Sequence, residues 1–250
     1  MTDPQQPNTT ITALEAEDAR RAEEIERLVD DIASGRPRAG GLSFGITALD
    51  DFIPLGPGRK AVVVVALPWQ PAGETSFVVA QSFAKQGHNP LCVNPGWSPY
   101  WDGALDVLRL ESAGGPIDYD VVKQRTGGSQ PVIIDQFSQL HWDTAKGHAA
   151  REQVVADVGR ALHWLAWERQ SPVVVFTRRR TKDVIRMSVD DLRSDGALEY
   201  HVDALLMVDP YPKKATADIL VGKHRNGPTG HFPGVDWPDL PRTAYRRGEA

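Results

Sequence analysis

The sequence predicts an α/β protein built around a mainly parallel sheet. Residues 61–67 form a continuous run of β-branched and other apolar side chains, which is typical of a strand buried on both faces. Similar short runs recur at residues 131–135 and 171–177, with segments of helical periodicity between them. Strands that alternate with helices form βαβ units with right-handed crossovers, and such units build a mainly parallel sheet.

The other elements continue this alternation along the chain. We expect two further strands, at residues 90–94 and 204–208. We expect helices at residues 75–86, 101–110 and 149–169. Residues 217–223 either pair with one of the strands or form a hairpin. These elements belong to one domain at residues 35–240, which opens with the glycine-rich linker GRPRAGG.

An amphipathic helix is predicted at residues 10–34, ahead of the domain. Its apolar positions fall on one stripe at spacings of three to four residues: Ile11, Leu14, Ile25, Leu28, Val29 and Ile32. The stripe either packs on the helix's own domain or docks on a neighbouring subunit, and the pattern favours neither strongly. The polar tail at residues 1–9 is expected to be disordered, and residues 241–250 form a second tail after the domain.

The amino-acid composition excludes several classes of protein. The 250 residues are 41% hydrophobic, enough for one domain with a sizeable core. The net charge of −5 excludes an overall basic field, so any nucleic-acid contact needs a local basic patch. The single cysteine, Cys92, excludes a disulfide framework and a cysteine-rich zinc site. No signal peptide or membrane span is recognisable, so the sequence predicts a soluble cytoplasmic protein with no membrane partner.

A nucleotide-binding loop is expected after the first strand, because ligands of an open parallel sheet lie at the carboxyl ends of its strands. The P-loop pattern is G-x-x-x-x-G-K-[ST]. Here Pro68 takes the place of the first glycine, and Gly73 that of the second. Glu74 takes the place of the lysine, Thr75 supplies the hydroxyl, and Ser76 follows it. Alone, this is a weak signal.

Six sequence blocks make the signal specific, because they occur in the order found in the DnaB family of replicative helicases. They are GLSFGITALDDF (41–52), AGETSFVVAQSFA (72–84), PVIIDQFSQL (131–140), the segment 151–177, DLRSDGALEYHVDALLMV (191–208) and KHRNGPTG (223–230). The third resembles the family's Walker B strand and ends its apolar run at Asp135. The last is similar to the family's K-x-R-N-G-P-T-G signature.

The resemblance implies a RecA-like P-loop NTPase core that binds ATP and Mg²⁺. It also implies self-association into a hexameric ring on single-stranded DNA, with ATP between subunits and an arginine finger supplied by the neighbour. By position the finger is Arg225, with Lys223 beside it. The alternative for KHRNGPTG is a tight turn made by its Asn-Gly and Pro-Thr-Gly residues. Another replication protein is the alternative partner.

The loop has lost features that ATP binding requires. Glu74 places a carboxylate where a lysine would neutralise the phosphates, and the lost charge-assisted bond is worth roughly 1.5–3 kcal/mol. Pro68 and Pro71 each remove an N–H donor, and Trp69 adds bulk. With the repulsion between carboxylate and triphosphate, these changes weaken ATP affinity by on the order of a thousandfold.

Two other positions agree with a loss of hydrolysis. Gly96 lies near the place of the family's catalytic glutamate, and Arg178 takes the place of a glutamine that senses the γ-phosphate. Thr75 and Asp135 remain, and in an active member they would hold Mg²⁺. Their retention indicates either residual metal binding or ordinary structural roles, such as a helix cap for the threonine.

The most basic segment is the run Arg178, Arg179, Arg180 and Lys182. It is a solvated loop, a contact for phosphate or single-stranded DNA, or a salt-bridge partner of Glu74. The aromatic residues Trp97, Tyr100 and Trp101 either stack bases or belong to the core, and Trp142, Trp164 and Trp167 are interpreted as core. The sequence favours a DnaB-like pseudo-ATPase with an assembly or DNA-binding role. The alternative is an active ATP-dependent helicase or translocase with an altered nucleotide site.

Overall fold

The computed structural model describes residues 41–55, 61–67, 72–94, 106–109, 117–128, 130–137, 142–143, 151–178 and 198–238. The predicted helix at residues 10–34 and the two predicted tails lie outside the described residues. None of the described helices is long and apolar enough to cross a bilayer.

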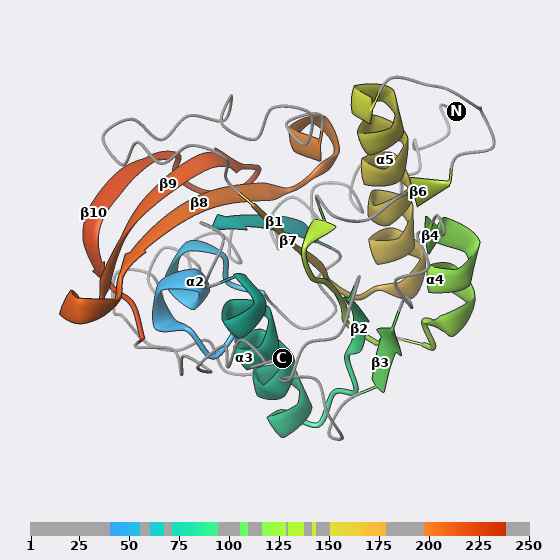
Figure 1. Ribbon diagram of the computed structural model, residues 1–250, viewed down its shortest axis with the longest axis horizontal. Coiled ribbons are helices and arrows are strands. Elements are labelled where there is room, and N and C mark those ends of the chain that lie inside the picture. Colours follow the sequence, from blue (N-terminus) through green and yellow to red (C-terminus); the bar gives the residue numbers. More distant parts are fainter. Residues whose placement is uncertain are drawn as a thin grey trace, which may run out of the picture. The chain divides into compact units, whose positions relative to one another are not determined.

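A mainly parallel sheet dominates the described part of the chain (Figure 1). Its eight described strands are β1 (Val62–Leu67), β2 (Leu91–Asn94), β3 (Asp106–Arg109), β5 (Val132–Ile134), β7 (Val173–Arg178), β8 (Ala204–Tyr211), β9 (Thr216–His224) and β10 (Gly230–Asp236). They lie in the order β10-β9-β8-β1-β7-β5-β2-β3. Two short strands, β4 (Ile117–Asp118) and β6 (Trp142–Asp143), pair in a separate parallel ladder.

The strand directions divide the sheet into two parts. All pairs from β8 through β1, β7, β5 and β2 to β3 are parallel, which confirms the prediction from alternating strands and helices. β8, β9 and β10 continue the sheet as an antiparallel meander, with a 3₁₀ turn (Pro212–Lys214) between β8 and β9. Residues 217–223 therefore do both things expected of them, since they pair with β8 and form hairpins.

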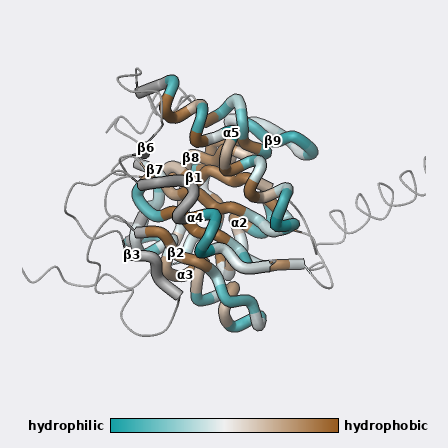
Figure 2. The backbone as a smooth tube through the Cα atoms, turned by 90° about the vertical axis from the view of Figure 1, so that its right-hand side faces the viewer, coloured by the Kyte–Doolittle hydropathy of each residue, from teal (hydrophilic) through white to brown (hydrophobic). Residues whose placement is uncertain are grey.

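Helices bury both faces of the sheet. α2 (Thr47–Phe52) and α3 (Ala72–Lys85) share one core with Val63, Val65 and Leu67 of β1. α4 (Tyr119–Arg125) and α5 (Arg151–Arg169) share the other core with Val62, Val64 and Ala66. Because side chains alternate along a strand, every residue of β1 is buried. In Figure 2 the hydrophobic segments accordingly gather at the strands in the centre.

The prediction of a helix at residues 101–110 was wrong where the structure describes this segment. Asp106–Arg109 form β3, which extends the sheet beside β2 with Cys92 opposite Val107. A short apolar run of this length fits either a strand or a helix, so periodicity could not decide between them. Residues 106–109 form a strand because the edge of β2 offers backbone groups for them to pair with.

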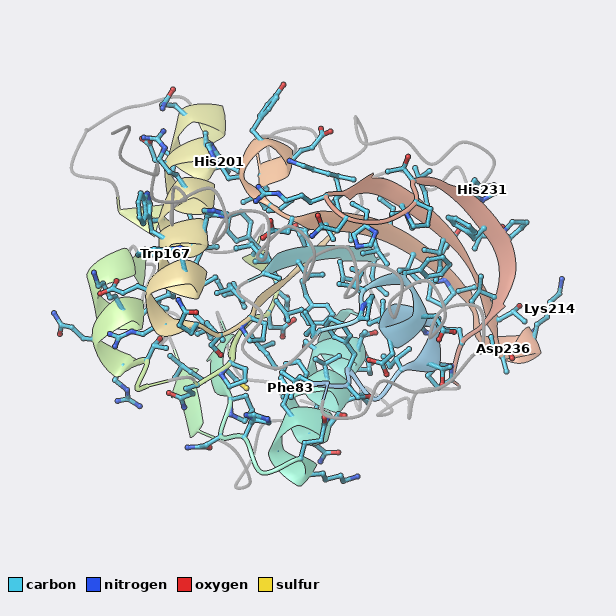
Figure 3. All side chains as sticks on the ribbon, turned by 180° about the vertical axis from the view of Figure 1, so that it is seen from behind. Phe83, Trp167, His201, Lys214, His231 and Asp236 are labelled. Carbon is cyan, nitrogen blue, oxygen red and sulfur yellow. The ribbon has the colours of Figure 1, made fainter. Side chains whose placement is uncertain are left out.

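The assignment of Trp164 and Trp167 to the core was also wrong. Their side chains are 58% and 53% exposed, and their rings meet edge to face with centroids 5.7 Å apart. The buried positions of α5 recur at helical spacing, and they are Val155, Val158, Leu162, Leu165 and Ala166. The two tryptophans fall off this stripe, so they lie on the outer side of the helix, as Figure 3 shows for Trp167.

The segment before β1 is hydrogen-bonded to the C-terminal end of α3. Gln86 donates to the Ser43 carbonyl oxygen (2.8 Å) and accepts from the Ser43 N–H (2.9 Å). Asp50 accepts from the Ser43 hydroxyl (2.7 Å) and from the Phe44 N–H (2.6 Å). Burial of Asp50 raises its pKa, and these hydrogen bonds oppose the rise. The C-terminal end of the helix that follows the predicted nucleotide loop is thus tied to the segment before β1.

Candidate functional site at two edges of the sheet

The carboxyl edge of the parallel sheet brings together two of the positions singled out in the sequence, Asp135 and Arg178. β1 ends at Leu67, which lies opposite Arg178 at the end of the neighbouring strand β7. β5 is the next strand, and Asp135 directly follows it. The Asp135 N–H donates to the carbonyl oxygen of Val93 in β2 (2.9 Å), and its side chain is 1% exposed. Asp135 and Arg178 therefore follow adjacent strands at the edge where the loop after β1 begins.

The first turn of α3 holds the other predicted nucleotide-binding residues. α3 begins at Ala72, three residues before its predicted start, so Thr75 lies inside the first turn and not at the N-cap. Thr75 and Ser76 are completely buried, and the Ser76 hydroxyl donates to the Gly73 carbonyl oxygen (3.0 Å). Neither hydroxyl is exposed to solvent.

Glu74 is half-buried in the same turn. The first turn of a helix carries a positive end of the helix dipole, so a carboxylate stabilises it by roughly 0.3–1 kcal/mol. Glu74 in place of the P-loop lysine therefore repels a triphosphate but stabilises α3. A local structural benefit is available to Glu74 without any ligand.

Several predicted residues lie outside the described residues. They are Pro68, Trp69 and Pro71 of the loop, Gly96, the aromatic residues Trp97, Tyr100 and Trp101, and Arg179, Arg180 and Lys182 of the basic run. Of Arg178 only the backbone is described. Among the described residues, no group of three or more His, Cys, Asp or Glu side chains is placed to hold a metal ion.

A shallow depression of about 420 Å³ lies away from this edge. It is lined by Gly87, His88, Asn89, Arg125, Gly127, Gln130 and Pro131. These residues precede β2 and β5, so the depression is at the amino ends of those strands. Ligands of open parallel sheets bind at the opposite, carboxyl ends, and the depression is therefore not the predicted nucleotide site.

The amino edge of the sheet carries an organised charged cluster around Asp203. One carboxylate oxygen, Oδ2, accepts from the N–H of Val62, the first residue of β1 (2.9 Å). The other, Oδ1, lies 3.1 Å from Nε of Arg225. The backbone repeats both links, since Asp203 N–H donates to Val62 O and Arg225 N–H donates to Asp203 O (both 2.8 Å). Sequence reasoning gave Asp203 no role.

The KHRNGPTG segment combines a tight turn with this cluster. Residues 225–229 are exposed, and Lys223 Nζ donates to the carbonyl oxygen of Glu199 (2.5 Å). Gly227 lies beneath the ring of His224, and a Cβ at Gly227 would come within 1.7 Å of His224 Nδ1. A larger residue at this position would force the His224 ring to move. The turn interpretation thus has a physical basis, and it leaves Arg225 at the surface.

The two edges are separated by the length of β1. Asp203 and Arg225 are linked to its first residue, whereas Glu74 and Thr75 follow its last. Six residues of strand span about 17–20 Å. Arg225 therefore cannot reach the first turn of α3 in the same molecule.

Comparison with known proteins identifies similar sequences and folds. The family described as DnaB-like helicase C terminal domain matches residues 119–235. The replicative DNA helicase DnaB of Leifsonia xyli subsp. xyli is 33% identical over 119 residues, 43% of this chain and 25% of that protein. The solved ATPase domain of G40P has a TM-score of 0.61 at 17% identity, covering 87% of this chain and 98% of that one.

A second solved structure, of a DnaB-like replicative helicase studied with its interactions with primase, has a TM-score of 0.61 at 18% identity. It covers 84% of this chain and 63% of that chain. These likenesses establish the RecA-like fold. The chain spans about a quarter of the length of the helicases whose sequences it matches, and the family match begins after α3, beyond the predicted nucleotide loop.

Proposed function

We propose that the protein acts in DNA replication or DNA metabolism as a pseudo-ATPase, since residues 119–235 match the family described as DnaB-like helicase C terminal domain. Its role is then assembly or DNA binding, without ATP hydrolysis. The observation that carries the proposal is Glu74 in the first turn of α3, the helix that follows β1 in the chain, immediately before the buried Thr75.

The residues of this turn do not fit a magnesium–nucleotide complex. A P-loop presents a cation and a hydroxyl to the phosphates and metal. Here the first turn presents a carboxylate, and the hydroxyls of Thr75 and Ser76 are buried, the latter donating to Gly73 O. The sequence adds Pro68, Trp69 and Pro71 in the loop, with Gly96 and Arg178 at the base and sensor positions. No catalytic step is therefore assigned to ATP or Mg²⁺.

Assembly is the role that the amino edge supports best. Arg225 pairs with Asp203 at the edge opposite the predicted loop, and its side chain is 54% exposed there, so a second molecule can approach it. The partner is a second copy, as in a ring of subunits, or another replication protein, and a solved DnaB-like helicase is described with primase. The basic run at residues 178–182 is the candidate contact for single-stranded DNA.

The competing function is an active ATP-dependent DNA helicase or translocase with an altered site. The retained pair of Thr75 and Asp135 favours it, because each follows the strand that an active member would use. This function needs a replacement cation near Glu74, and Arg178 is the candidate, since β7 ends beside β1.

Calorimetric titration with ATP, with and without Mg²⁺, tests the proposal together with ATP hydrolysis in the presence of single-stranded DNA. We expect no binding at micromolar concentrations and no stimulated hydrolysis. Glu74→Lys should not restore either, because the prolines and Trp69 of the loop remain. Hydrolysis above background that Asp135→Asn abolishes would reject the pseudo-ATPase and establish the active alternative.

A further inference from the structure

The outer face of α5 carries two large exposed aromatic side chains. Trp164 and Trp167 are 58% and 53% exposed, and their rings meet edge to face with centroids 5.7 Å apart. They lie one turn apart on a helix of 19 residues, so they form one continuous apolar surface. Tryptophan is enriched among the residues that dominate the binding energy of protein interfaces, and an exposed pair marks an interaction site.

Two neighbouring segments cover the flanks of α5 and leave the tryptophans exposed. On one flank lies α4 (Figure 1), where Lys123 Nζ is 2.9 Å from Glu168 Oε2 and the Lys123 carbonyl oxygen accepts from Arg169 Nη2 (3.2 Å). On the other flank, residues 198–201 pack so closely that a Cβ at Gly159 would lie 3.3 Å from their side chains. The outer face is therefore a ridge between these flanks, which a partner can approach along its length.

The charged groups beside the tryptophans balance one another, which favours a protein partner over nucleic acid. Arg160 Nη2 lies 2.9 Å from Asp157 Oδ1, and Glu168 pairs with Lys123 of α4. The hydrogen bond from Lys123 lowers the pKa of Glu168, so this carboxylate stays ionised. Nucleic acid is bound through an excess of cations, whereas each cation here has an acidic neighbour. Apolar side chains with a charged rim of both signs are typical of protein interfaces.

The charges on the ridge are placed symmetrically about Trp164. Arg160 lies four residues before Trp164 and Glu168 four residues after it, and residues at this spacing share one face of a helix. A helix rises 1.5 Å per residue, so the cation and the anion lie about 6 Å on either side of the tryptophan. When a second copy of α5 approaches in the antiparallel direction with the two Trp164 side chains together, each Arg160 faces the other copy's Glu168. A two-fold interface requires a surface that is complementary to itself in this way.

We infer that the outer face of α5, with Trp164 and Trp167 at its centre, is a two-fold docking surface for a second copy of this chain. Trp167, one turn beyond Trp164, then lies close to the other copy's Arg160, where a cation–π contact adds to the ion pair. The change of ionic partners costs little, because exposed ion pairs within one chain contribute little to stability. Both copies use the same face, so this contact differs from the head-to-tail contacts of a ring. It goes beyond the proposed function and does not depend on the nucleotide site.

The first test is the mass of the full chain by sedimentation equilibrium over a concentration series. We expect a monomer–dimer equilibrium in the micromolar range, because two tryptophans per copy make a small interface. Trp164→Ala and Trp167→Ala should each weaken dimerisation about 30-fold or more, since interface tryptophans dominate binding and each acts twice across the two-fold axis. Tyr200→Ala is the matched control, because Tyr200 is an aromatic residue that is 79% exposed outside α5. It should leave dimerisation unchanged.

Charge reversal tests the two-fold symmetry itself. Arg160→Glu and Glu168→Arg each bring like charges together across the axis, so each should weaken dimerisation about tenfold. The double variant should recover it, because the signs are exchanged and the facing pairs are again opposite. An equal mixture of the two single variants should recover it as well, in mixed dimers. Lys214→Glu reverses an exposed charge between β8 and β9, away from α5, and should change nothing.

Four outcomes overturn the inference. A wild-type chain that stays monomeric at every soluble concentration excludes the second copy. An assembly whose mass neither tryptophan substitution changes uses another surface. Failure of both the double variant and the mixture to recover association shows that the charges do not face each other. A monomeric chain whose affinity for single-stranded DNA falls in Trp164→Ala uses the tryptophans to stack bases. ATP hydrolysis is a separate measurement, so this inference and the pseudo-ATPase proposal can fail independently.

Discussion

The two edges of the sheet differ in what surrounds their polar residues. At the carboxyl edge, Thr75 and Ser76 are buried and Asp135 is 1% exposed, while a carboxylate occupies the first turn of α3. At the amino edge, Arg225 is exposed and anchored by Asp203. The hydroxyl groups at the carboxyl edge are buried, whereas the guanidinium group of Arg225 at the amino edge is exposed.

The family match includes the charged pair of the amino edge but only part of the carboxyl edge, since it contains Asp135 and Arg178 and leaves out α3. The DnaB-like match covers residues 119–235, which include Asp203 and Arg225 but not α3. A catalytic site requires particular side chains at particular positions, whereas an interface requires only that a suitable surface remains exposed. The proposed assembly role therefore uses residues inside the family match, whereas the proposed loss of ATP binding depends on Glu74, which lies outside it.

The largest effect is expected from Gly227→Ala at the amino edge. The new Cβ would lie 1.7 Å from Nδ1 and 1.9 Å from Cε1 of His224, so the half-buried ring must move. Overpacking of this kind costs about 1–3 kcal/mol. The free energy of unfolding should fall by that amount in chemical denaturation. The loss should be smaller when Gly227→Ala is made in a His224→Ala background, and equal losses in both would refute the clash.

The opposite sign is expected for Gly73→Ala at the carboxyl edge. No described atom lies within 4 Å of a Cβ built there, and Gly73 is in the first turn of a helix. Alanine should therefore raise the free energy of unfolding by roughly 0.5–1 kcal/mol. A loop that wraps phosphate needs glycine for close approach of its backbone. If the wild type bound ATP measurably and Gly73→Ala weakened that binding, the carboxyl edge would be a working nucleotide site, contrary to the proposal.

The fold was predictable because burial leaves a strong trace in the sequence. The β-branched run at residues 61–67 gave β1, and helices between such runs implied parallel neighbours. β3 was missed because its four residues match either periodicity, and its identity depends on the open edge of β2. The exposure of Trp164 and Trp167 was missed because they were assigned to the core as aromatic residues. Their positions along α5 were not compared with the helical spacing of its buried residues.

The candidate site was predictable only in part, for a different physical reason. Glu74, Thr75 and Asp135 could be placed at one edge, since each follows a strand or begins the helix after one. The pairing of Asp203 with Arg225 joins residues far apart in the chain, and it depends on the register of the β8–β9 hairpin. That register contains a bulge between Leu205 and Leu206, which no sequence pattern revealed.

The smallest effect is a pH dependence at the amino edge. Partial burial of His201, and then the positive charges of Arg160, His163 and Lys223, lower the pKa of His201 below its usual 6.5. Between that lowered pKa and 6.5 the folded state binds fewer protons than the unfolded state, so stability rises with pH through this window. Acidification below 6.5 should therefore destabilise the wild type more than a His201→Gln variant in denaturation series. Parallel pH profiles for the two proteins would contradict a lowered pKa for His201 in the folded state.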